Sequence, residues 1–416
     1  MKNYITKIKI NKLLQLNGLE IDLSDQKFPH LIITGCNGSG KTTLLNAIAD
    51  FLEKTMNDKS LYFLKYRDWV DSAKSSLENC NKDSDRPSLQ QTLRRREENV
   101  EDFFGKVELE MNFPDIIKQL QDSRFFVAFY PATRLPEMKE PTNPTKPNIT
   151  NPKNVKVRSS LTSQFLYFLS DLKIQEALAV VAKKEKDADK IKEWFTCFEG
   201  LLRQIFVDET LTLEFNYQDY NFFIRSDNQM VKFTELSDGY AAIIEIVADL
   251  ILKMQGEGSL SSSYNKRGVV LIDEIETHLH LRLQKEILPF LTTIFPNIQF
   301  VVTTHSPFVL SSLPNAVAYD LEHKKVLSEL TDYSFEALSE GYFGVPSQSS
   351  YIRTELGRFK DLVLKGSLSD NEKLELKEIK KNFDKISSSV LPALKGEYDD
   401  FYIKNSEHIK EVLKSL

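Results

Sequence analysis

The chain has few cysteines, no long apolar run and no excess of positive charge, and each shortage argues against a class of protein. Only three cysteines occur in 416 residues and none forms a C-x-x-C pair, so neither a disulfide framework nor a zinc hook is expected. The formal net charge is -6, so a surface that binds nucleic acid has to be a local patch.

The sequence also lacks a stretch of about 18 apolar residues, so no membrane-spanning helix is expected. The first residues alternate polar and apolar side chains with charges, unlike a signal peptide. Hydrophobic residues make up 41% and charged residues 27%, which is ordinary for a globular protein, and the length predicts two or three domains. We therefore predict a cytoplasmic protein without a membrane partner.

What the chain does contain is a complete phosphate-binding motif, G-x-x-x-x-G-K-[ST], between an apolar strand-like run at 31–34 and a helix-like run at 43–49. Backbone N–H groups of such a loop converge on a triphosphate at a helix N-terminus. Lys41 can reach the β- and γ-phosphates, and the Thr42 hydroxyl can bind Mg²⁺. A glycine-rich turn with an accidental lysine is the less favoured alternative. The predicted nucleotide-binding residues are Gly35, Cys36, Asn37, Gly38, Ser39, Gly40, Lys41, Thr42 and Thr43.

A second motif is a run of hydrophobic residues that leads into Asp273 and Glu274. A strand buried in a parallel sheet would bring Asp273 beside the phosphate loop, where it can orient Mg²⁺. Glu274 is then placed to polarise the attacking water as a general base. The alternative, a strand that ends in a solvated turn, is disfavoured by the phosphate loop upstream.

Three of the six histidines fall in two short segments near these carboxylates. His278, His280 and His305 have the chemistry of metal ligands when acids lie nearby. Histidine is equally suited to bond a γ-phosphate or to sense a dimer interface. We favour His305, at the end of the next predicted strand, as a γ-phosphate sensor with a catalytic role rather than a zinc ligand.

The segment Leu-Ser-Asp-Gly-Tyr at 236–240 opens a predicted helix, with Ser237 available as its N-cap. Together with the other motifs it resembles the signature sequence of ABC-type ATPases, whose serine and glycine amides contact the γ-phosphate of the opposite subunit. The usual pattern is Leu-Ser-Gly-Gly-Gln, so Asp238 and Tyr240 depart from it. An aspartate near a γ-phosphate is unfavourable unless it points away, which lowers the expected hydrolysis rate more than dimerisation.

The order of these motifs, within residues 1 to about 312, resembles the ABC-type ATPase heads of the SMC, RecF and OLD group. The resemblance implies an α/β fold, a P-loop head with a mixed sheet core, an antiparallel edge sheet and a helical lobe, followed by a helical extension. It implies ATP and Mg²⁺ as cofactors, a trans contact through Ser237, Asp238 and Gly239, and a D-loop at His278 and His280. The group's Q-loop glutamine is not evident, and Arg134 is interpreted as its substitute.

Within that group the chain looks similar to ATPases of bacterial anti-phage systems, above all those of Septu systems. This implies a homodimer or higher even-numbered homo-oligomer that acts with a separately encoded nuclease effector of the HNH type. A RecF-like or SMC-like DNA repair ATPase is one alternative, and an ATP-bound scaffold with little turnover is another.

The predicted organisation divides the chain into five parts. The first part of the head is 1–135 with a helical insertion at about 55–105, and a Pro/Asn-rich loop follows at 136–158. A helical lobe is expected at 159–260, the rest of the head at 261–332, and a helical extension at 333–416.

No nuclease is expected within this chain. Asp370, Glu375 and Lys377 imitate a nuclease pattern, but Ser369 and Glu372 form a capping box that predicts a helix instead of the strand required. DNA contact is conceivable through the lysines of the Pro/Asn-rich loop, at positions 146, 153 and 156. The arginines at 94–96 are offset by two following glutamates, so a solvated helix face is expected there.

Overall fold

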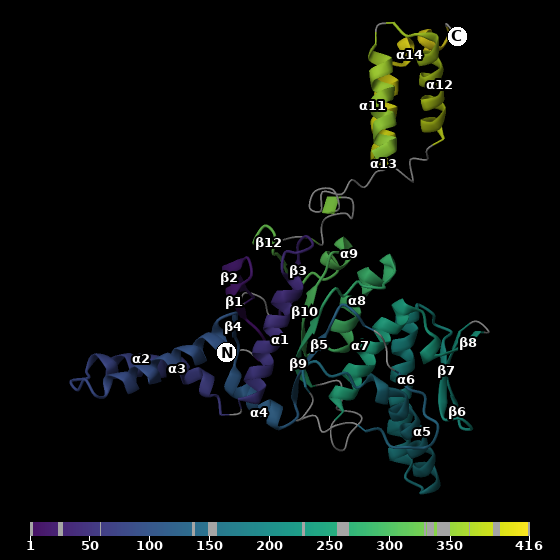
Figure 1. The fold of residues 1–416 in the computed structure, drawn as a ribbon. Helices are drawn as coiled ribbons and strands as arrows, with labels where there is room; N and C mark the ends of the chain where they lie inside the picture. The colour runs from purple at the N-terminus through teal and green to yellow at the C-terminus, as the bar shows by residue number, and fades with distance from the viewer. Residues whose placement is uncertain are drawn as a thin grey trace. The chain divides into compact units, whose positions relative to one another are not determined.

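The computed structural model divides the chain into two compact units, Met1–Asp332 and Tyr333–Leu416 (Figure 1). Each unit is described by itself. The residues that the structure describes are 3–23, 28–58, 60–134, 138–148, 156–226, 229–255, 266–327, 330, 337–338, 350–365, 367–385 and 392–414.

A six-stranded sheet forms the centre of the first unit, in the order β12-β11-β3-β10-β9-β5. All neighbouring strands pair in parallel except β12, which lies antiparallel at one edge. Strands buried on both faces need apolar residues throughout, which explains the continuous hydrophobic runs in the sequence. The strands are β3 His30–Thr34, β5 Phe125–Tyr130, β9 Arg267–Ile272, β10 Ile298–Thr303, β11 Ala316–Asp320 and β12 Lys325–Leu327.

Helices cover both faces of this sheet. Figure 1 shows α1 (Lys41–Asn57) on one side, with α7 (Asp238–Met254) and α8 (Leu281–Ile294) on the other. Because β10 lies between β3 and β9, the carboxyl ends of these three strands are neighbours. That arrangement brings the loops after β3, β9 and β10 together. The short helix α9 (Pro307–Leu310) follows β10.

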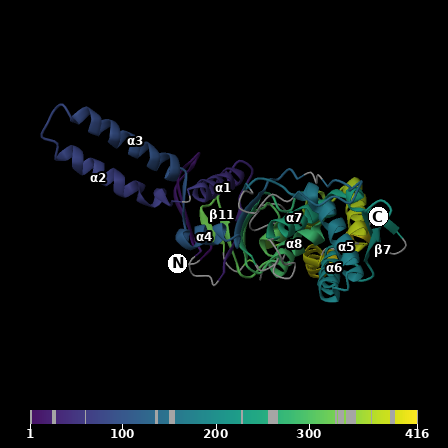
Figure 2. The same cartoon turned by 90° about the horizontal axis from the view of Figure 1, so that it is seen from below.

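A smaller antiparallel sheet, β2-β1-β4, confirms the predicted edge sheet. From it a helical hairpin extends away from the sheets (Figures 1 and 2). The root of the hairpin is held by packed aromatic rings, among them Phe63 stacked on Phe103 with ring centroids 4.7 Å apart. These elements are β1 Lys7–Leu13, β2 Leu16–Asp22, η1 Tyr62–Lys65, α2 Tyr66–Glu78, α3 Arg86–Phe104, β4 Val107–Glu110 and α4 Phe113–Gln121.

The helical lobe contains α5, α6, α7 and a third antiparallel sheet, β6-β7-β8. Its link to the central sheet is a buried polar network around Asp249 on α7, which is 0% exposed. Asp249 accepts hydrogen bonds from the Tyr130 hydroxyl and the Leu161 amide, each at 2.6 Å, and pairs with Lys253 at 2.7 Å. The other elements are η3 Thr162–Gln164, α5 Phe165–Val181, α6 Glu185–Phe206, β6 Thr212–Asn216, β7 Asn221–Ser226, β8 Gln229–Lys232 and η4 Phe233–Glu235.

The second unit is helical in its described residues, as expected, and has its own apolar core that includes Phe359, Phe383 and Tyr398. Ser369 and Glu372 form the predicted capping box at the start of α12, so the nuclease-like residues lie on a helix. Within the predicted helical extension at 333–416, the structure describes residues 337–338, 350–365, 367–385 and 392–414. The helices are α11 Ser350–Leu364, α12 Asp370–Asp384, α13 Pro392–Lys404 and α14 Ser406–Lys414.

Among all described residues, no helix is both long and apolar enough to cross a membrane.

A buried histidine makes the stability of the first unit depend on pH. His30 is 4% exposed, its Nδ1 accepts a hydrogen bond from the Phe300 amide at 3.2 Å, and burial lowers its pKa from 6.5 to about 4. Because the unfolded chain takes up this proton near pH 6.5, stability is complete above that pH and falls as the pH approaches 4. The expected loss is about 3 kcal/mol, measured as the urea midpoint between pH 7 and pH 4.5.

The variant His30→Asn keeps an acceptor near the Nδ1 position but cannot be protonated. We expect it to have a flatter dependence of stability on pH than the wild type. The exposed His408→Asn serves as the matched control and should keep the wild-type slope. An unchanged slope in His30→Asn would assign the acid sensitivity to other groups.

Candidate nucleotide-binding site

The phosphate loop turns sharply between β3 and α1, and its glycines make this turn possible. Gly38 and Gly40 have φ angles of 82° and 98°, a left-handed region that other residues rarely adopt. A Cβ atom on Gly35 would lie 2.8 Å from the Ser39 hydroxyl. The predicted strand, loop and helix are therefore present, with α1 beginning at Lys41.

Lys41 lies across this loop as a buried cation. It is 6% exposed, and its Nζ donates hydrogen bonds to the carbonyl oxygens of Gly35 and Cys36, both at 3.0 Å. Burial lowers the pKa of Lys41, and the charge of Glu274 opposes this most strongly. The buried Ser39 hydroxyl has no hydrogen-bond partner among the described residues. A polyphosphate in the loop would supply acceptors to both groups.

Asp273 follows β9 and links the end of β10 to the start of α1. It is 3% exposed, and its Oδ1 accepts hydrogen bonds from the Thr42 hydroxyl at 3.2 Å and the Thr303 hydroxyl at 2.6 Å. A hydroxyl and a carboxylate so close together are hard oxygen donors, which is the chemistry Mg²⁺ prefers. Thr42 and Asp273 therefore fit the predicted metal site.

Glu274 is held in an unusual backbone conformation. Its φ angle is 44°, a left-handed value that costs a non-glycine residue about 1–3 kcal/mol. The surrounding structure maintains this conformation, since the Glu274 amide donates to the Thr303 hydroxyl at 2.7 Å. Its carboxylate accepts a hydrogen bond from the Thr277 hydroxyl at 3.3 Å. Sequence reasoning missed Thr303, although its position at the end of a predicted strand was a usable signal.

Arg134, the predicted substitute for the Q-loop glutamine, contacts the backbone of the turn after β9. It is 4% exposed and donates to the carbonyl oxygens of Asp273 at 2.9 Å and Glu274 at 3.0 Å. A longer bond of 3.4 Å reaches the carbonyl oxygen of Ile275. Burial lowers the pKa of Arg134, and the nearby carboxylates, first that of Glu245, oppose the effect.

His305 follows β10 and is hydrogen-bonded to the turn after β9. Its amide donates to Glu276 Oε1 at 2.5 Å, and burial followed by the charge of Lys41 lowers its pKa. The lowered pKa favours the neutral ring, which can offer one ring N–H to an anion. Glu276 was not predicted as a functional residue, yet its Oε2 is buried without a hydrogen-bond partner among the described residues. Its position two residues after Glu274 was the only signal in the sequence.

The signature-like segment begins α7, with Ser237 and Asp238 exposed. Ser237 occupies the N-cap position as predicted, and its hydroxyl makes no capping hydrogen bond. Gly239 is buried, and a Cβ atom there would lie 2.8 Å from the carbonyl oxygen of His278. The signature-like segment and the predicted D-loop therefore pack against each other within one chain.

The three histidines do not form a metal cluster among the described residues. His278 and His280 are exposed, and the one group of metal-capable side chains detected there is Asp320, Glu322 and His323. That group already has a structural role, because Asp320 Oδ1 accepts the amides of Glu322 at 2.8 Å and His323 at 3.2 Å within a turn. The zinc alternative therefore gains no support.

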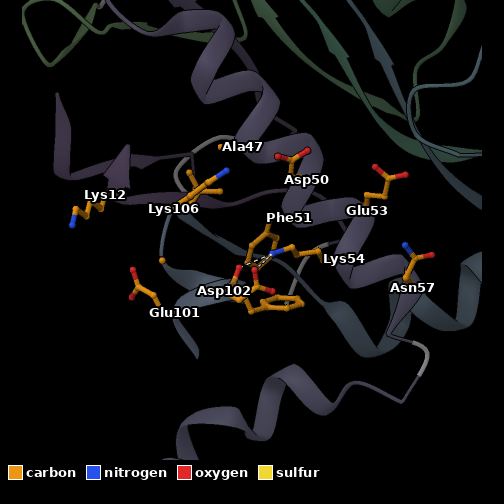
Figure 3. Close-up of a pocket in the computed structure, with 13 residues that line it drawn as sticks. Lys12, Ala47, Asp50, Phe51, Glu53, Lys54, Asn57, Glu101, Asp102 and Lys106 are labelled. Carbon is orange, nitrogen blue, oxygen red and sulfur yellow. Dashed lines mark hydrogen bonds and ion pairs between the residues drawn. The ribbon is translucent and has the colours of Figure 1, made fainter. Parts of the chain in front are cut away.

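A separate cavity of about 450 Å³ lies between α1 and the junction of α3 with β4 (Figure 3). Lys54 and Asp102 form an ion pair in it at 3.0 Å, and Lys12 and Lys106 share the lining with further acids. It contains no residue of the phosphate loop and none of the carboxylates after β9. Its mixed charges do not favour a triphosphate.

Comparison with known proteins gives a match to the family model described as "AAA domain, putative AbiEii toxin, Type IV TA system", over residues 31–311. The Septu protein PtuA of Bacillus mycoides (strain KBAB4) is 25% identical over 96% of this chain and 54% of its own length. The Retron Vc95 probable ATPase of Vibrio cholerae serotype O1 biovar El Tor is 31% identical over 43% of this chain and 32% of its own length. The chain thus spans about half the length of the first relative and about a third of the length of the second.

Among solved structures, a crystal structure of the SMC head bound to the C-terminal winged-helix domain of ScpA matches with a TM-score of 0.41 and 12% identity. That match covers 79% of this chain and 99% of the other. The likeness is distant, and the fold is defined by the strand order given above.

Proposed function

The chain belongs to this AAA domain family, and on that premise we propose that it hydrolyses ATP, pairs head-to-tail on ATP and controls a separately encoded nuclease in anti-phage defence. The observation that carries the proposal is the meeting of Lys41, Thr42, Asp273 and Glu274 at one edge of the central sheet. Each of these residues has the chemistry that phosphoryl transfer requires at its position.

In the proposed reaction, Glu274 accepts a proton from a water molecule as the water oxygen attacks the γ-phosphorus. The bond between the γ-phosphorus and the bridging oxygen breaks, so ADP and phosphate are the products. Lys41 neutralises charge on the β- and γ-phosphates, and His305 donates its ring N–H to the γ-phosphate. Thr42 and Asp273 would hold Mg²⁺, which would supply further positive charge to the triphosphate.

A second head is needed because the signature-like segment forms no part of the cis cluster just described. Ser237 is exposed, and its hydroxyl makes no capping bond. The amides at the start of α7 form a site for an anion. In a head-to-tail pair, Ser237 and Gly239 would bind the γ-phosphate held by the partner's loop.

The effector nuclease and the defence role rest on the resemblance to Septu and retron ATPases. An HNH nuclease encoded beside this chain is the proposed partner. Cells that carry both genes should resist phage, and cells that carry this chain alone should not. Equal phage sensitivity in both strains would overturn the defence role without touching the ATPase assignment.

DNA contact belongs to the same proposal. Lys146 and Lys156 are exposed and could bind phosphates, while Lys153 lies outside the described residues. By contrast, Arg94 is exposed and pairs with Glu98 at 3.4 Å, as on a solvated helix face, whereas Arg96 is half-buried and donates to the Trp69 carbonyl.

An ATP-bound scaffold with little turnover is a second candidate function. The exposed Asp238 favours it, because a carboxylate in the first turn of α7 competes with a γ-phosphate for the same helix N-terminus. The two candidates predict different rates for the wild type, whereas both predict pairing on ATP.

Replacing Ser237 with arginine tests the pairing. The bulky cation should block contact with the partner's nucleotide, while ATP binding to the phosphate loop of the same chain is retained. We expect ATP to convert wild-type monomers into dimers, measured by light scattering after size-exclusion chromatography, and to leave Ser237→Arg monomeric. Ser72→Arg, an exposed serine on α2, is the matched control. Dimers of Ser237→Arg would overturn the head-to-tail arrangement.

A further inference from the structure

Arg134 is a buried cation whose hydrogen bonds, among the described residues, all go to backbone carbonyl oxygens. Besides Asp273, Glu274 and Ile275, the fourth acceptor is Pro131 at 3.3 Å. Its Nε is buried without a hydrogen-bond partner among the described residues. Burying a guanidinium away from water costs free energy. The planar fork of N–H donors, which can bind several acceptors at once, offsets this cost.

The backbone of the turn after β9 explains why its carbonyl groups point to a single cation. The left-handed conformation of Glu274 interrupts the alternation of a strand, so successive carbonyls leave the sheet on one side. The amides of the same turn are bound by the neighbouring strands. Asp273 donates to the Tyr130 carbonyl at 2.8 Å, and Ile275 donates to the Thr303 carbonyl at 3.1 Å.

The turn that carries the general base is therefore held from two directions. β5 and β10 bind its amides, and Arg134 alone binds three of its carbonyl oxygens in succession among the described residues. Arg134 also lies within the electrostatic range of Glu245 on α7, the helix that begins with the signature-like segment. Its charge acts on Asp273 and Glu274 as well.

We propose that Arg134 is a positioning residue for hydrolysis: its fork holds the backbone at Glu274 in the left-handed conformation that directs the carboxylate at the attacking water. This role rests on the proposed ATPase function. Arg134 touches neither nucleotide nor water in this role, and it acts only through the turn. ATP binding depends on the phosphate loop and needs no help from Arg134.

Two variants test the role. Arg134→Gln removes the charge and can bind at most two carbonyl oxygens, so the turn can relax and the carboxylate moves from its position. A displacement of about 1 Å lowers kcat by about 100-fold. ATP affinity, measured on protein without turnover at low temperature, should change by less than about threefold. Arg134→Lys keeps the charge without the fork and should recover part of kcat.

The split between kcat and ATP affinity separates positioning from a general loss of structure. A relaxed turn displaces the carboxylate of Glu274 but leaves the phosphate loop intact, so Arg134→Gln should lower kcat without a matching loss of ATP affinity. Arg203→Gln is the matched control, because Arg203 is a half-buried arginine that donates to the Leu211 carbonyl at 2.8 Å, remote in sequence from the site. It should change neither kcat nor ATP affinity.

An active wild type with an equally active Arg134→Gln overturns this role alone. A variant that loses kcat and ATP affinity in equal measure, without recovery in Arg134→Lys, also overturns it and assigns Arg134 to folding. A wild type that does not turn over ATP overturns the proposed function first and this role with it, so the two failures give different results.

Discussion

Lys41→Ala is expected to abolish ATP binding at physiological concentrations. Lys41 is buried within the phosphate loop, and its ammonium makes two hydrogen bonds to loop carbonyls that a polyphosphate can replace. Each charge-assisted bond to phosphate contributes about 1.5–3 kcal/mol. Losing two of them weakens affinity by about 100- to 10,000-fold. Isothermal titration calorimetry with ATP and Mg²⁺ measures the loss directly.

The stability of the fold is not expected to fall in this variant, because burial disfavours the charged form of Lys41 and lowers its pKa. The thermal midpoint without nucleotide should therefore stay close to that of the wild type, and the stabilisation by added ATP should vanish. Lys54→Ala is the matched control, since Lys54 lies on the same helix and pairs with Asp102 outside the loop. Wild-type affinity in Lys41→Ala would remove the phosphate loop from the proposed mechanism.

Glu274→Gln is expected to stop hydrolysis while leaving ATP bound. The amide has almost the same shape as the carboxylate and can still accept the hydrogen bond from Thr277, but it cannot take a proton from water. General base catalysis contributes about 100- to 10,000-fold, so phosphate release should fall by about that factor. Pairing on ATP should persist longer, because the nucleotide is no longer consumed.

The same experiment decides between enzyme and scaffold. Glu286→Gln is the control, since this exposed glutamate on α8 pairs only weakly with Arg282 at 3.5 Å. If the wild type and Glu274→Gln release phosphate at equal, negligible rates, the enzymatic proposal is wrong and the scaffold is favoured. A wild type faster than Glu274→Gln by the expected factor, with Glu286→Gln unchanged, supports hydrolysis by the assigned base.

Much of the fold and of the cis site could be predicted because the signals are local. The phosphate loop, the carboxylates after β9 and the capping box at Ser369 each occupy fewer than ten consecutive residues, and the α/β class follows from the apolar strands around them. An apolar run predicts a buried strand without any information about contacts between distant residues.

The parts that could not be predicted depend on contacts between distant segments. Thr303 reaches the site because β10 lies between β3 and β9. The sequence of a single strand does not specify which strands are its neighbours in the sheet. Arg134 binds carbonyl groups about 140 positions away, so a one-dimensional motif could place it but could not show what it holds.

The tight contact between Gly239 and His278 has a consequence for how two heads would work together. The turn from Glu274 to Leu279 is closed by its own amides, at 3.0 Å from Thr277 to Glu274 and 2.9 Å from Leu279 to Glu276. If α7 shifts when it engages a partner's nucleotide, as the proposed pairing implies, its contact at Gly239 would move this turn directly. ATP turnover should be cooperative, with a Hill coefficient above one, and Gly239→Ala should disturb that cooperativity before it disturbs affinity.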